Sequence, residues 1–422
     1  MLTVSEAQQR ILSHFEPAVS HRRAAVARGT NGVELQTLSL DQTAGRVLAE
    51  DICATVDLPP FDSSSMDGFA LHAADTRGSN SSNPVTLTVV ADIPAGNLSN
   101  IVIAPGQAAR IMTGAPIPAG ADAVVTVEVT DQSREPGAPA PEAVSVYQTV
   151  QPGENIRHRG DDIFAGSIVL ARGRRLRAQD LGLLAMLGVS KLQVYRSPRL
   201  AIFSNGDELI PVEAPLTPGK IRDANSYTLS ILAAQAGAEV IPLGIAPDER
   251  AAIGKLLDVA VDVKADLIVS SAGVSVGAYD FVKQVIEEQG RLEFWKVNMR
   301  PGKPLAFGLY QGIPFFGLPG NPVSAFIGFE VFVRPALERL SGAASLPFTR
   351  QRARLAEAIE SDGRESCMRA VVTEENGALL ARLTGHQGSG NLLSLVQANA
   401  LLIVPSGVKS LPASAEVEVW ML

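Results

Sequence analysis

From residue 198 onward, short apolar runs alternate with longer segments of helical period, and this alternation limits the chain to few folds. Apolar runs such as "RLAIFSN" (199–205), "EVIPLGIA" (239–246) and "DLIVSS" (266–271) are followed by helix-like segments such as "NSYTLSILAAQAG" (225–237) and "DERAAIGKLLDVAVDV" (248–263). Strands that alternate with helices of about 10 to 15 residues form a mainly parallel sheet with helices on both faces. Residues 197–341 are therefore predicted to form a doubly wound α/β domain.

The rest of the chain predicts further domains, as expected for 422 residues. Residues 61–160 contain short β-type runs separated by Gly, Pro and Asn, which predict a β-rich insertion. The segments 1–60 and 161–196 flank it and are expected to form one elongated helical and extended domain, which begins with an amphipathic helix in "MLTVSEAQQRILSHF" and "SEAQ" as its capping box. Residues 342–422 are again β-rich and fit a small barrel, so the chain is expected to be a multi-domain α/β and β protein.

Charge and composition exclude several classes of protein. With 44 acidic against 36 basic residues and a net charge of -8, we expect no nucleic acid as a partner. The two cysteines, Cys53 and Cys367, show no CxxC spacing and the five histidines no metal-ligand spacing, so zinc is not expected and both thiols should be buried. No export signal begins the sequence and no apolar run is long enough for a membrane span, which predicts a cytoplasmic protein without a membrane partner.

Three predicted loops of the α/β domain are rich in small residues. They are "FSNGDEL" (203–209), "SSAGVSVGAYD" (270–280) and "GLPGNPVS" (317–324), and each follows a predicted strand. Ligands of open parallel sheets bind at the carboxyl ends of the strands, where small residues let the backbone approach and free N–H groups and hydroxyls hold phosphate oxygens. Each loop alone could be an ordinary βα turn, but together they predict an anion site that includes the hydroxyls of Ser271 and Ser275.

Charged residues gather at the same predicted edge of the sheet. Carboxylates placed close together repel one another and usually recruit a cation, and Mg²⁺ prefers their hard oxygens. We therefore expect Mg²⁺ as a cofactor, held by Glu208, Asp248 and Asp280, although either aspartate could instead be a helix N-cap. The stretch "WKVNMRPGKP" adds Lys296, Arg300 and Lys303, which suit a phosphate or another oxyanion, or alternatively form a solvated surface run.

These loops resemble motifs of the molybdopterin molybdotransferase (molybdenum insertase) family, to which the C-terminal domain of gephyrin is also similar. The likeness covers nearly the whole chain. The matching segments, in the family's order, are "FDSSSMDGFA", "RIMTGAPIPAGADAVV", "GENIRHRGDDI", "FSNGDEL", "SSAGVSVG", "KVNMRPGKP", "GLPGNPVSA" and "GHQGS". The resemblance implies that the protein takes adenylylated molybdopterin, cleaves its phosphoanhydride in a Mg²⁺-dependent step that releases AMP, and transfers molybdate to the pterin dithiolene.

The resemblance also implies site residues and partners. It adds Asp67, Thr113, Arg157 and Asp162 from the β-rich insertion and its junction, Pro319 and Pro322 from the third loop, and Ser389 from the last domain. Asp67, Asp162, Glu208 and Asp280 would be catalytic, and the basic residues would neutralise phosphates or molybdate. The family implies a homodimer in which the β unit of one chain faces the α/β domain of the other, with an adenylyltransferase and recipient molybdoenzymes as further partners.

Three residues depart from the family pattern without removing a carboxylate. Arg300 stands where lysine is usual, Asn205 where threonine is usual, and Ala272 where glycine is usual. The arginine keeps the charge but adds a planar fork, and the alanine adds a methyl group where the backbone would approach a ligand. Two other functions remain open from the sequence, namely a molybdopterin adenylyltransferase and a non-catalytic scaffold.

Overall fold

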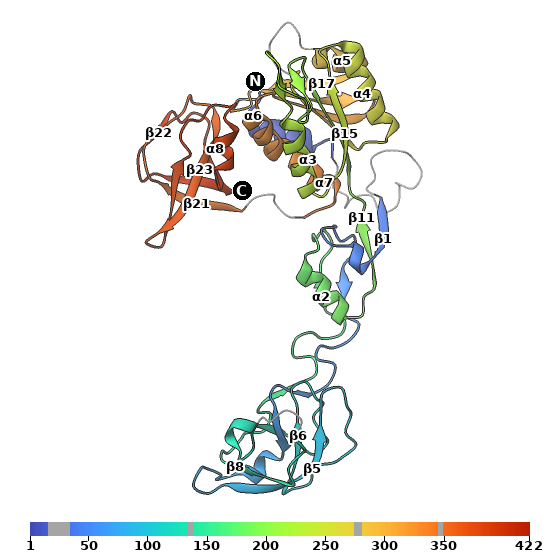
Figure 1. Cartoon of the computed structure of the whole chain (residues 1–422), viewed down its shortest axis with the longest axis vertical. Coiled ribbons are helices and arrows are strands. Elements are labelled where there is room, and N and C mark those ends of the chain that lie inside the picture. The colour runs from blue at the N-terminus through green and yellow to red at the C-terminus, as the bar shows by residue number, and fades with distance from the viewer. Residues whose placement is uncertain (16–33, 134–137, 274–280, 345–348) are drawn as a thin grey trace. The chain divides into compact units, whose positions relative to one another are not determined.

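The computed structural model describes residues 1–15, 34–133, 138–273, 281–344 and 349–422 (Figure 1). The chain divides into two compact units. The first consists of Met1–Glu50, Arg172–Ala185 and Val189–Leu422, and the second of Asp51–Ala171 with Met186–Gly188. The second unit is therefore an insertion within the first. In the described part of the chain, no helix is long and apolar enough to cross a membrane.

A mixed sheet with the order β15-β12-β16-β20-β19-β17 forms the centre of the first unit. Its strands are β12 (Arg199–Asn205), β15 (Glu239–Ala246), β16 (Leu267–Ser271), β17 (Gly290–Lys296), β19 (Pro304–Tyr310) and β20 (Ile313–Leu318). Strand β12 is parallel to β15 and β16, and β16 is parallel to β20, whereas β19 is antiparallel to β20 and β17. The prediction of a mainly parallel sheet is confirmed.

Helices cover both faces of this sheet because its strands are apolar on both sides (Figure 1). Ile202 packs into one apolar core, and its neighbour Phe203 packs into the other. The first core includes α1, α3 and the α6–α7 region, and the second includes α4 and α5. The bounds are α1 (Val4–Leu12), α3 (Asn225–Gln235), α4 (Arg250–Asp262), α5 (Phe281–Gln289), α6 (Pro322–Gly328), a π-helical turn (Phe329–Val333) and α7 (Arg334–Leu340).

Helix α1 differs from its prediction in two respects. Its capping box is formed by Thr3 and Glu6, not by the "SEAQ" segment that begins two residues later. Its buried residues Val4, Ala7 and Ile11 belong to the α/β core. The stripe at positions i, i+3 and i+7 must be covered by apolar surface, and the α/β domain supplies it. Residues 4–12 therefore pack with the α/β domain, whereas the sequence groups all of residues 1–60 in the elongated domain.

The segments that lead into the insertion pair with the segments that lead out of it. In the first unit, β1 (Leu35–Ser39) is antiparallel to β11 (Lys191–Tyr195), and α2 (Ala178–Met186) precedes β11. In the second unit, β2 (Ile52–Cys53) pairs with β10 (Ile168–Leu170). Cys53 is exposed there, contrary to the prediction, because it lies on a short two-stranded ladder, whereas Cys367 is buried.

The second unit contains a sheet of order β7-β4-β6-β5-β8. Its strands are β4 (Gly68–Leu71), β5 (Val85–Ile93), β6 (Gln107–Ile111), β7 (Ala123–Thr126) and β8 (Ala143–Val146). Apolar cores lie on both sides, with Phe69 in one and Ala70 in the other. A separate short ladder pairs β3 (Ser63–Ser64) with β9 (Ile156–Arg157). In the chain, β3 precedes β4 and β9 follows β8.

The C-terminal residues close a barrel in which β23 pairs with β24 and β25, β21 with β24 and β27, and β25 with β27. The strands are β21 (Arg350–Leu355), β23 (Glu365–Glu375), β24 (Ala378–Leu383), β25 (Ala400–Val404) and β27 (Glu416–Met421), and the short helix α8 spans Leu392–Val396. The small strand β18 (Met299–Arg300) of the α/β domain adds to β23. This pairing joins the basic segment to the barrel, and the predicted barrel is confirmed.

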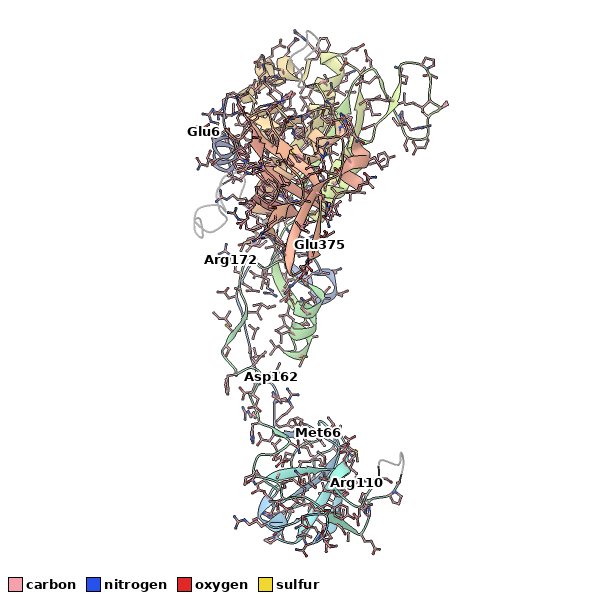
Figure 2. The ribbon with its side chains drawn as sticks, turned by 90° about the vertical axis from the view of Figure 1, so that its left-hand side faces the viewer. Glu6, Met66, Arg110, Asp162, Arg172 and Glu375 are labelled. Carbon is pink, nitrogen blue, oxygen red and sulfur yellow. The ribbon has the colours of Figure 1, made fainter. Side chains whose placement is uncertain are left out.

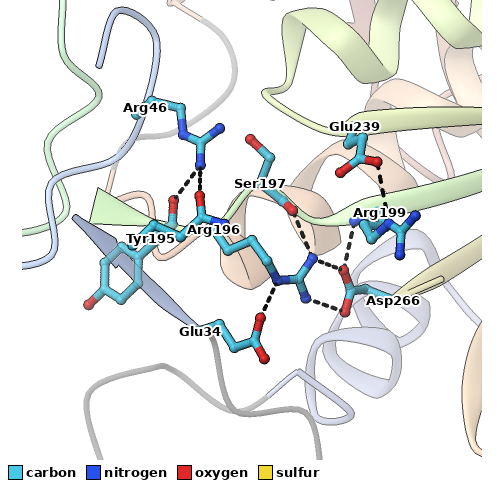
Figure 3. A network of polar contacts seen from close by, with 9 residues as sticks. Glu34, Arg46, Tyr195, Arg196, Ser197, Arg199, Glu239 and Asp266 are labelled. Atoms are coloured by element: carbon cyan, nitrogen blue, oxygen red, sulfur yellow. Dashed lines mark hydrogen bonds and ion pairs between the residues drawn. The ribbon is translucent and has the colours of Figure 1, made fainter. Parts of the chain in front are cut away.

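A polar network fixes the chain where β11 leads into β12 (Figure 3). The Arg196 guanidinium donates to both carboxylate oxygens of Asp266, at 2.9 and 2.8 Å, and its Nε lies 3.1 Å from Glu34. The backbone N–H of Arg199 also donates to Asp266, at 2.7 Å. The hydrogen bonds to Asp266 raise the pKa of Arg196 above its ordinary value. Asp266 therefore holds both ends of the linker 196–199.

Replacement of Asp266 by alanine should lower the free energy of unfolding of the first unit by about 2 kcal/mol, because it leaves a half-buried arginine without its bidentate partner. Glu34→Ala is the matched control, since Glu34 is largely exposed and should contribute less than about 0.5 kcal/mol. Urea denaturation followed by tryptophan fluorescence measures both, because Trp295 and Trp420 lie in this unit. Equal losses of unfolding free energy in the two variants would contradict the role of Asp266 as the residue that fixes this linker.

Candidate active site

The first small-residue loop follows β12 and brings Glu208 back over the end of that strand. The backbone N–H of Gly206 donates to the carbonyl of Ala246 at 3.1 Å, which fixes the loop beside β15. A Cβ atom on Gly206 would lie 2.6 Å from Oε2 of Glu208, so the carboxylate covers the glycine backbone. Gly206 adopts a φ of +149°, which favours glycine. The glycine thus permits the carboxylate to lie at the carboxyl edge of the sheet.

Asp248 reaches the same edge from the loop between β15 and α4. Its Oδ1 accepts a hydrogen bond from Nδ2 of Asn205 at 3.1 Å, and its backbone N–H donates to Oδ1 of Asp207 at 3.1 Å. The N-cap residue of α4 is Glu249, and no side-chain cap bond is present there. The alternative in which Asp248 caps α4 is therefore wrong, and this carboxylate faces the strand ends instead.

The second loop is described as far as Gly273. Oγ of Ser271 accepts a hydrogen bond from Nδ2 of Asn225 at 2.7 Å, and the same amide donates to the carbonyl of Gly320 at 2.8 Å. Asn225 thus joins the second loop to the third, and Ser271 contributes to this connection. The predicted residues Ser275 and Asp280 lie outside the described residues.

Ala272 lies where the backbone turns with a left-handed φ of +74°. Its backbone N–H donates to the carbonyl of Leu318 at 2.9 Å, so the turn is held by β20. A side chain with a Cβ atom in this conformation costs about 1 to 2 kcal/mol. The substitution that departs from the family pattern therefore carries backbone strain.

The variant Ala272→Gly is expected to raise the free energy of unfolding by about 0.5 to 1 kcal/mol, since relief of the left-handed strain exceeds the entropy cost of glycine. Ala234→Gly is the matched control, because Ala234 lies exposed in α3 and the same change should destabilise by about 1 kcal/mol. Denaturant midpoints with an unchanged slope would measure both. A loss of stability in Ala272→Gly would contradict the strain.

The third loop connects the α/β domain to the barrel. Pro319 is buried, and Pro322 is in the first turn of α6, where its missing N–H costs nothing. Between them, Nδ2 of Asn321 donates to Oγ of Ser389 at 3.0 Å, and the N–H of Val323 donates to the Ser389 carbonyl at 3.1 Å. The structure therefore brings Ser389 of the barrel to the third loop.

The basic segment leads from β17 to the barrel. Lys296 and Lys303 are exposed, and in the described part of the chain neither forms an ion pair. Arg300 lies in β18, with Nη1 3.8 Å from Oδ2 of Asp362, which also pairs with Arg364. The long distance and the shared carboxylate leave much of the Arg300 charge available to an anion.

The residues predicted in the β-rich insertion meet at one end of its sheet. Asp67 precedes β4 and Thr113 follows β6, and these strands are antiparallel with Gly68 opposite Ile111. Both the backbone N–H and Oγ1 of Thr113 donate to Oδ1 of Asp67, at 2.8 and 2.7 Å. A surface hollow of about 440 Å³, lined by residues 91–101, contains neither of them. The carboxylate of Asp67 is thus held by the loop after β6.

Arg157 and Asp162 lie near the same end of the insertion. They form an ion pair of 2.5 Å, and the pairing of Ser63 with Arg157 joins β9 to the strand that precedes Asp67. Figure 2 shows Asp162 in the paired chains that lead to the sheet, and Met66, next to Asp67, where those chains reach it. The four predicted residues of this unit therefore form two polar pairs on either side of β3.

Three family models match successive parts of the chain. Residues 2–188 match the family model "MoeA N-terminal region (domain I and II)", residues 201–339 match "Probable molybdopterin binding domain", and residues 352–422 match "MoeA C-terminal region (domain IV)". Molybdopterin molybdenumtransferase 2 of Mycobacterium tuberculosis is 39% identical over 96% of this chain and 99% of its own. The chain belongs to the MoeA family of molybdopterin molybdenumtransferases.

Further MoeA-family relatives are similar over nearly the whole length. The molybdopterin molybdenumtransferase of Bacillus subtilis is 36% identical over 92% of this chain and 90% of its own. The crystal structure of the molybdopterin biosynthesis MoeA protein of Pyrococcus horikoshii superposes with a TM-score of 0.79 at 30% identity and covers 100% of both chains. The protein is a molybdopterin molybdenumtransferase of molybdenum cofactor biosynthesis. The comparisons therefore favour this function and not the adenylyltransferase or the scaffold.

One candidate residue of this MoeA-family protein was missed in the sequence. Arg369 in β23 is only 1% exposed, and it donates to Oγ of Ser394 at 3.1 Å and to the carbonyl of Gly388 at 3.0 Å. No ion pair joins it to a carboxylate of the described residues. Burial and the charge of Arg300 lower its pKa to about 10, so it stays charged at neutral pH. The sequence feature that could have revealed it is a charged residue inside the apolar run "CMRAVV".

Asp62 was also missed, and it connects the two polar pairs of the insertion. Its Oδ1 accepts from the N–H of Arg159 at 2.8 Å, its Oδ2 lies 3.3 Å from Nδ1 of His158, and its carbonyl accepts from Ile117. These hydrogen bonds, first that from Arg159, lower the pKa of Asp62. The side chain of Asp62 thus binds the residues after Arg157, and its backbone carbonyl binds the loop after Thr113. Both partners are distant in sequence, so no local pattern reveals these contacts.

The donor set at the carboxyl edge fits a magnesium ion. Glu208 and Asp248 supply hard oxygens there, and no lysine or arginine of the described residues pairs with either. The described residues contain no cluster of three or more metal-ligating side chains. Magnesium keeps several waters and commonly uses one or two carboxylates together with substrate phosphates, so an incomplete cage is compatible with it.

Proposed function

We propose that this molybdenumtransferase acts on adenylylated molybdopterin, cleaves its phosphoanhydride with Mg²⁺ and releases AMP, and that molybdate then binds to the dithiolene. Cleavage of the anhydride consumes one water. Binding of molybdate releases one of its oxygens with the two thiol protons as water, so the atoms balance. We further propose that this reaction occurs in the cytoplasm, as expected for an enzyme of a cofactor-biosynthesis family.

The observation that carries this proposal is the buried charge of Arg369, which forms no ion pair with a described carboxylate and contacts the loop that presents Ser389. A buried cation without a carboxylate is unfavourable unless an anion completes the site. Arg300 adds a second positive charge beside it, and the hydroxyl of Ser389 adds a hydrogen-bonding group. Two guanidinium groups and a hydroxyl suit a tetrahedral oxyanion such as molybdate.

The other site residues divide by charge. Glu208 and Asp248, with Asp280, would hold Mg²⁺, which supplies charge neutralisation at the phosphates when bound. Lys296 and Lys303, with Ser271, Ser275 and the loop around Pro319 and Pro322, would bind the phosphates and pterin. Asp67, Thr113, Arg157 and Asp162 would come from the partner subunit of a homodimer and orient the substrate or its attacking water.

An assay of AMP release tests the proposed reaction. Purified protein is incubated with adenylylated molybdopterin, molybdate and Mg²⁺, and AMP is quantified by chromatography. AMP should appear with Mg²⁺ and not with an excess of EDTA, and molybdenum should co-elute with the pterin. Absence of AMP under saturating Mg²⁺ would contradict the reaction, and competition with tungstate in the same assay would define the preferred oxyanion.

An apolar stripe on α3 supports the homodimer. Tyr227 and Ile231, one turn apart, are 53% and 59% exposed, whereas Leu229 and Leu232 on the other side of the helix are buried. A helix that is apolar on both sides usually has a second partner. A second copy of the chain would cover this stripe.

The change Ile231→Glu should shift the protein from dimer to monomer at micromolar concentration, because a charge would have to be buried in the interface. Gln235→Glu is the matched control, since it adds the same charge at an exposed polar position of the same helix. Sedimentation velocity measures both variants. A dimer of unchanged affinity in Ile231→Glu would exclude α3 as the interface.

A further inference from the structure

Asn205 is the residue at which two of the three site loops meet. It ends β12, is 2% exposed, and donates from Nδ2 to Oδ1 of Asp248. Its amide also lies against Gly273, because a Cβ atom on that glycine would be 2.7 Å from Nδ2 and 2.8 Å from Oδ1. Gly273 has a φ of +72°, so glycine is required there both for conformation and for space. The Asn205 amide is thus enclosed between Asp248 and the second loop.

The orientation of this amide is determined by its contacts. Nδ2 has the Asp248 carboxylate as its acceptor, whereas Oδ1 is buried and has no hydrogen-bond partner in the described part of the chain. A buried carbonyl oxygen without a partner is unfavourable, and a smaller or apolar side chain would avoid this cost. Among the described residues, the hydrogen bond of this amide goes to the Asp248 carboxylate, so that carboxylate is the group on which Asn205 acts.

The neighbouring Ser204 shows that burial at this strand end does not itself require such a contact. Ser204 is fully buried and its Oγ also has no partner among the described residues, but it lies on the other face of the sheet, where Ile202 packs. Of these two residues, only Asn205 lies toward Asp248. Its polar contact is therefore specific to that carboxylate.

We propose that Asn205 is a positioning residue that fixes the Asp248 carboxylate for magnesium. The hydrogen bond from Nδ2 engages Oδ1, and the bond from the Asp248 backbone to Asp207 fixes the main chain. No hydrogen bond from the described residues engages Oδ2, so this oxygen remains for the cation. Groups that orient metal-ligating carboxylates commonly change metal affinity about 10- to 100-fold when removed. This inference rests on the proposed metal-dependent reaction and assigns a role to a residue that departs from the family pattern.

A double-mutant cycle on metal binding tests the inference without turnover. Mn²⁺ replaces Mg²⁺ as a paramagnetic probe, AMP is present to supply a phosphate, and free Mn²⁺ is measured by electron paramagnetic resonance. The variants are Asn205→Leu, Asp248→Asn, the double variant, and Ser204→Ala as the matched control. Circular dichroism and thermal melting verify that each variant is folded.

Asn205→Leu should weaken Mn²⁺ binding about tenfold or more, and Ser204→Ala should not change it. In the Asp248→Asn background the same leucine should have almost no further effect, since it acts through Asp248. In the AMP-release assay, Asn205→Leu should raise the Mg²⁺ concentration for half-maximal rate at least tenfold, and the maximal rate should change less than threefold.

Other results of the same experiments would contradict the proposals. Unchanged Mn²⁺ affinity in Asn205→Leu, or a full tenfold loss that persists in the Asp248→Asn background, would overturn the positioning role. Wild-type protein that binds no Mn²⁺ would overturn it together with the metal site. Wild-type protein that binds Mn²⁺ normally but releases no AMP would overturn the proposed reaction and leave the role of Asn205 to be judged by the cycle.

Discussion

Arg369→Leu is expected to lower molybdate binding and molybdate incorporation by a factor of about 100 to 1000. Removal of one strong donor from a preorganised oxyanion site commonly has an effect of this size. Among the residues that the structure describes, the buried guanidinium has only neutral partners, Ser394 and the carbonyl of Gly388, so leucine should change the free energy of unfolding by less than about 1 kcal/mol. Binding is measured by equilibrium dialysis, with molybdenum quantified by mass spectrometry.

Two further variants separate charge from other effects at this position. Arg369→Lys keeps the charge and loses the planar fork, so it should retain more binding than leucine. Arg382→Leu is the matched control, because Arg382 is an exposed barrel arginine whose partner Glu375 lies at the surface. Molybdate affinity that is unchanged in Arg369→Leu would refute the assignment of the oxyanion site.

Asp67→Ala should reduce AMP release by a factor of about 100 or more, with the protein folded and able to bind substrate. The carboxylate is held by two donors of Thr113, and an oriented group that contacts the reacting atoms commonly contributes this much. Thr113→Val removes one donor and keeps the backbone N–H, so a smaller loss is expected. The measurement is the initial rate of AMP release at saturating Mg²⁺.

Asp75→Ala is the matched control for Asp67. Its carboxylate also accepts a backbone N–H, that of Gly106 at 2.7 Å, but Gly106 precedes β6 and Thr113 follows it. The two aspartates thus lie at opposite ends of that strand, and Asp75→Ala should retain the wild-type rate within about twofold. A large and equal loss in both variants would indicate damage to the sheet and not loss of a catalytic group.

Heterodimers test whether Asp67 acts across subunits. A dimer of one Asp67→Ala chain and one Glu208→Ala chain would contain one site with both changes and one site with neither. It should therefore regain about half of the wild-type rate, although each homodimer is inactive. Inactivity of purified heterodimers would show that both residues serve the same chain.

Much of the fold could be predicted because its elements depend on local patterns. The alternating apolar runs from residue 198 predict the α/β sheet, and Ile202 and Phe203 face opposite cores because successive strand residues point to opposite sides. Small residues after β12, β16 and β20 predict the three loops, and Gly206 is required where Glu208 folds back. Site residues in such loops can be found in sequence because backbone conformation restricts their neighbours.

Other features depend on contacts between distant segments. The pattern of α1 indicates an amphipathic helix, but only the fold assigns its apolar side to the α/β core. An aspartate before a helix is compatible with an N-cap, and only the position of Asn205 shows that Asp248 binds the strand end instead. Side-chain hydrogen bonds of this kind join residues 43 positions apart.

The sequence by itself determined the order of strands and helices, the family, and the residue types that the chemistry requires, because these follow from local periodicity and short motifs. The tertiary structure decided which charges are paired. Arg369 is an arginine in an apolar run of the sequence, but its burial, without an ion pair to any described carboxylate, arises only when the barrel closes around β23. The electrostatic free energy of a charged group depends on its distance from other charges and on its exposure to solvent, and folding fixes both.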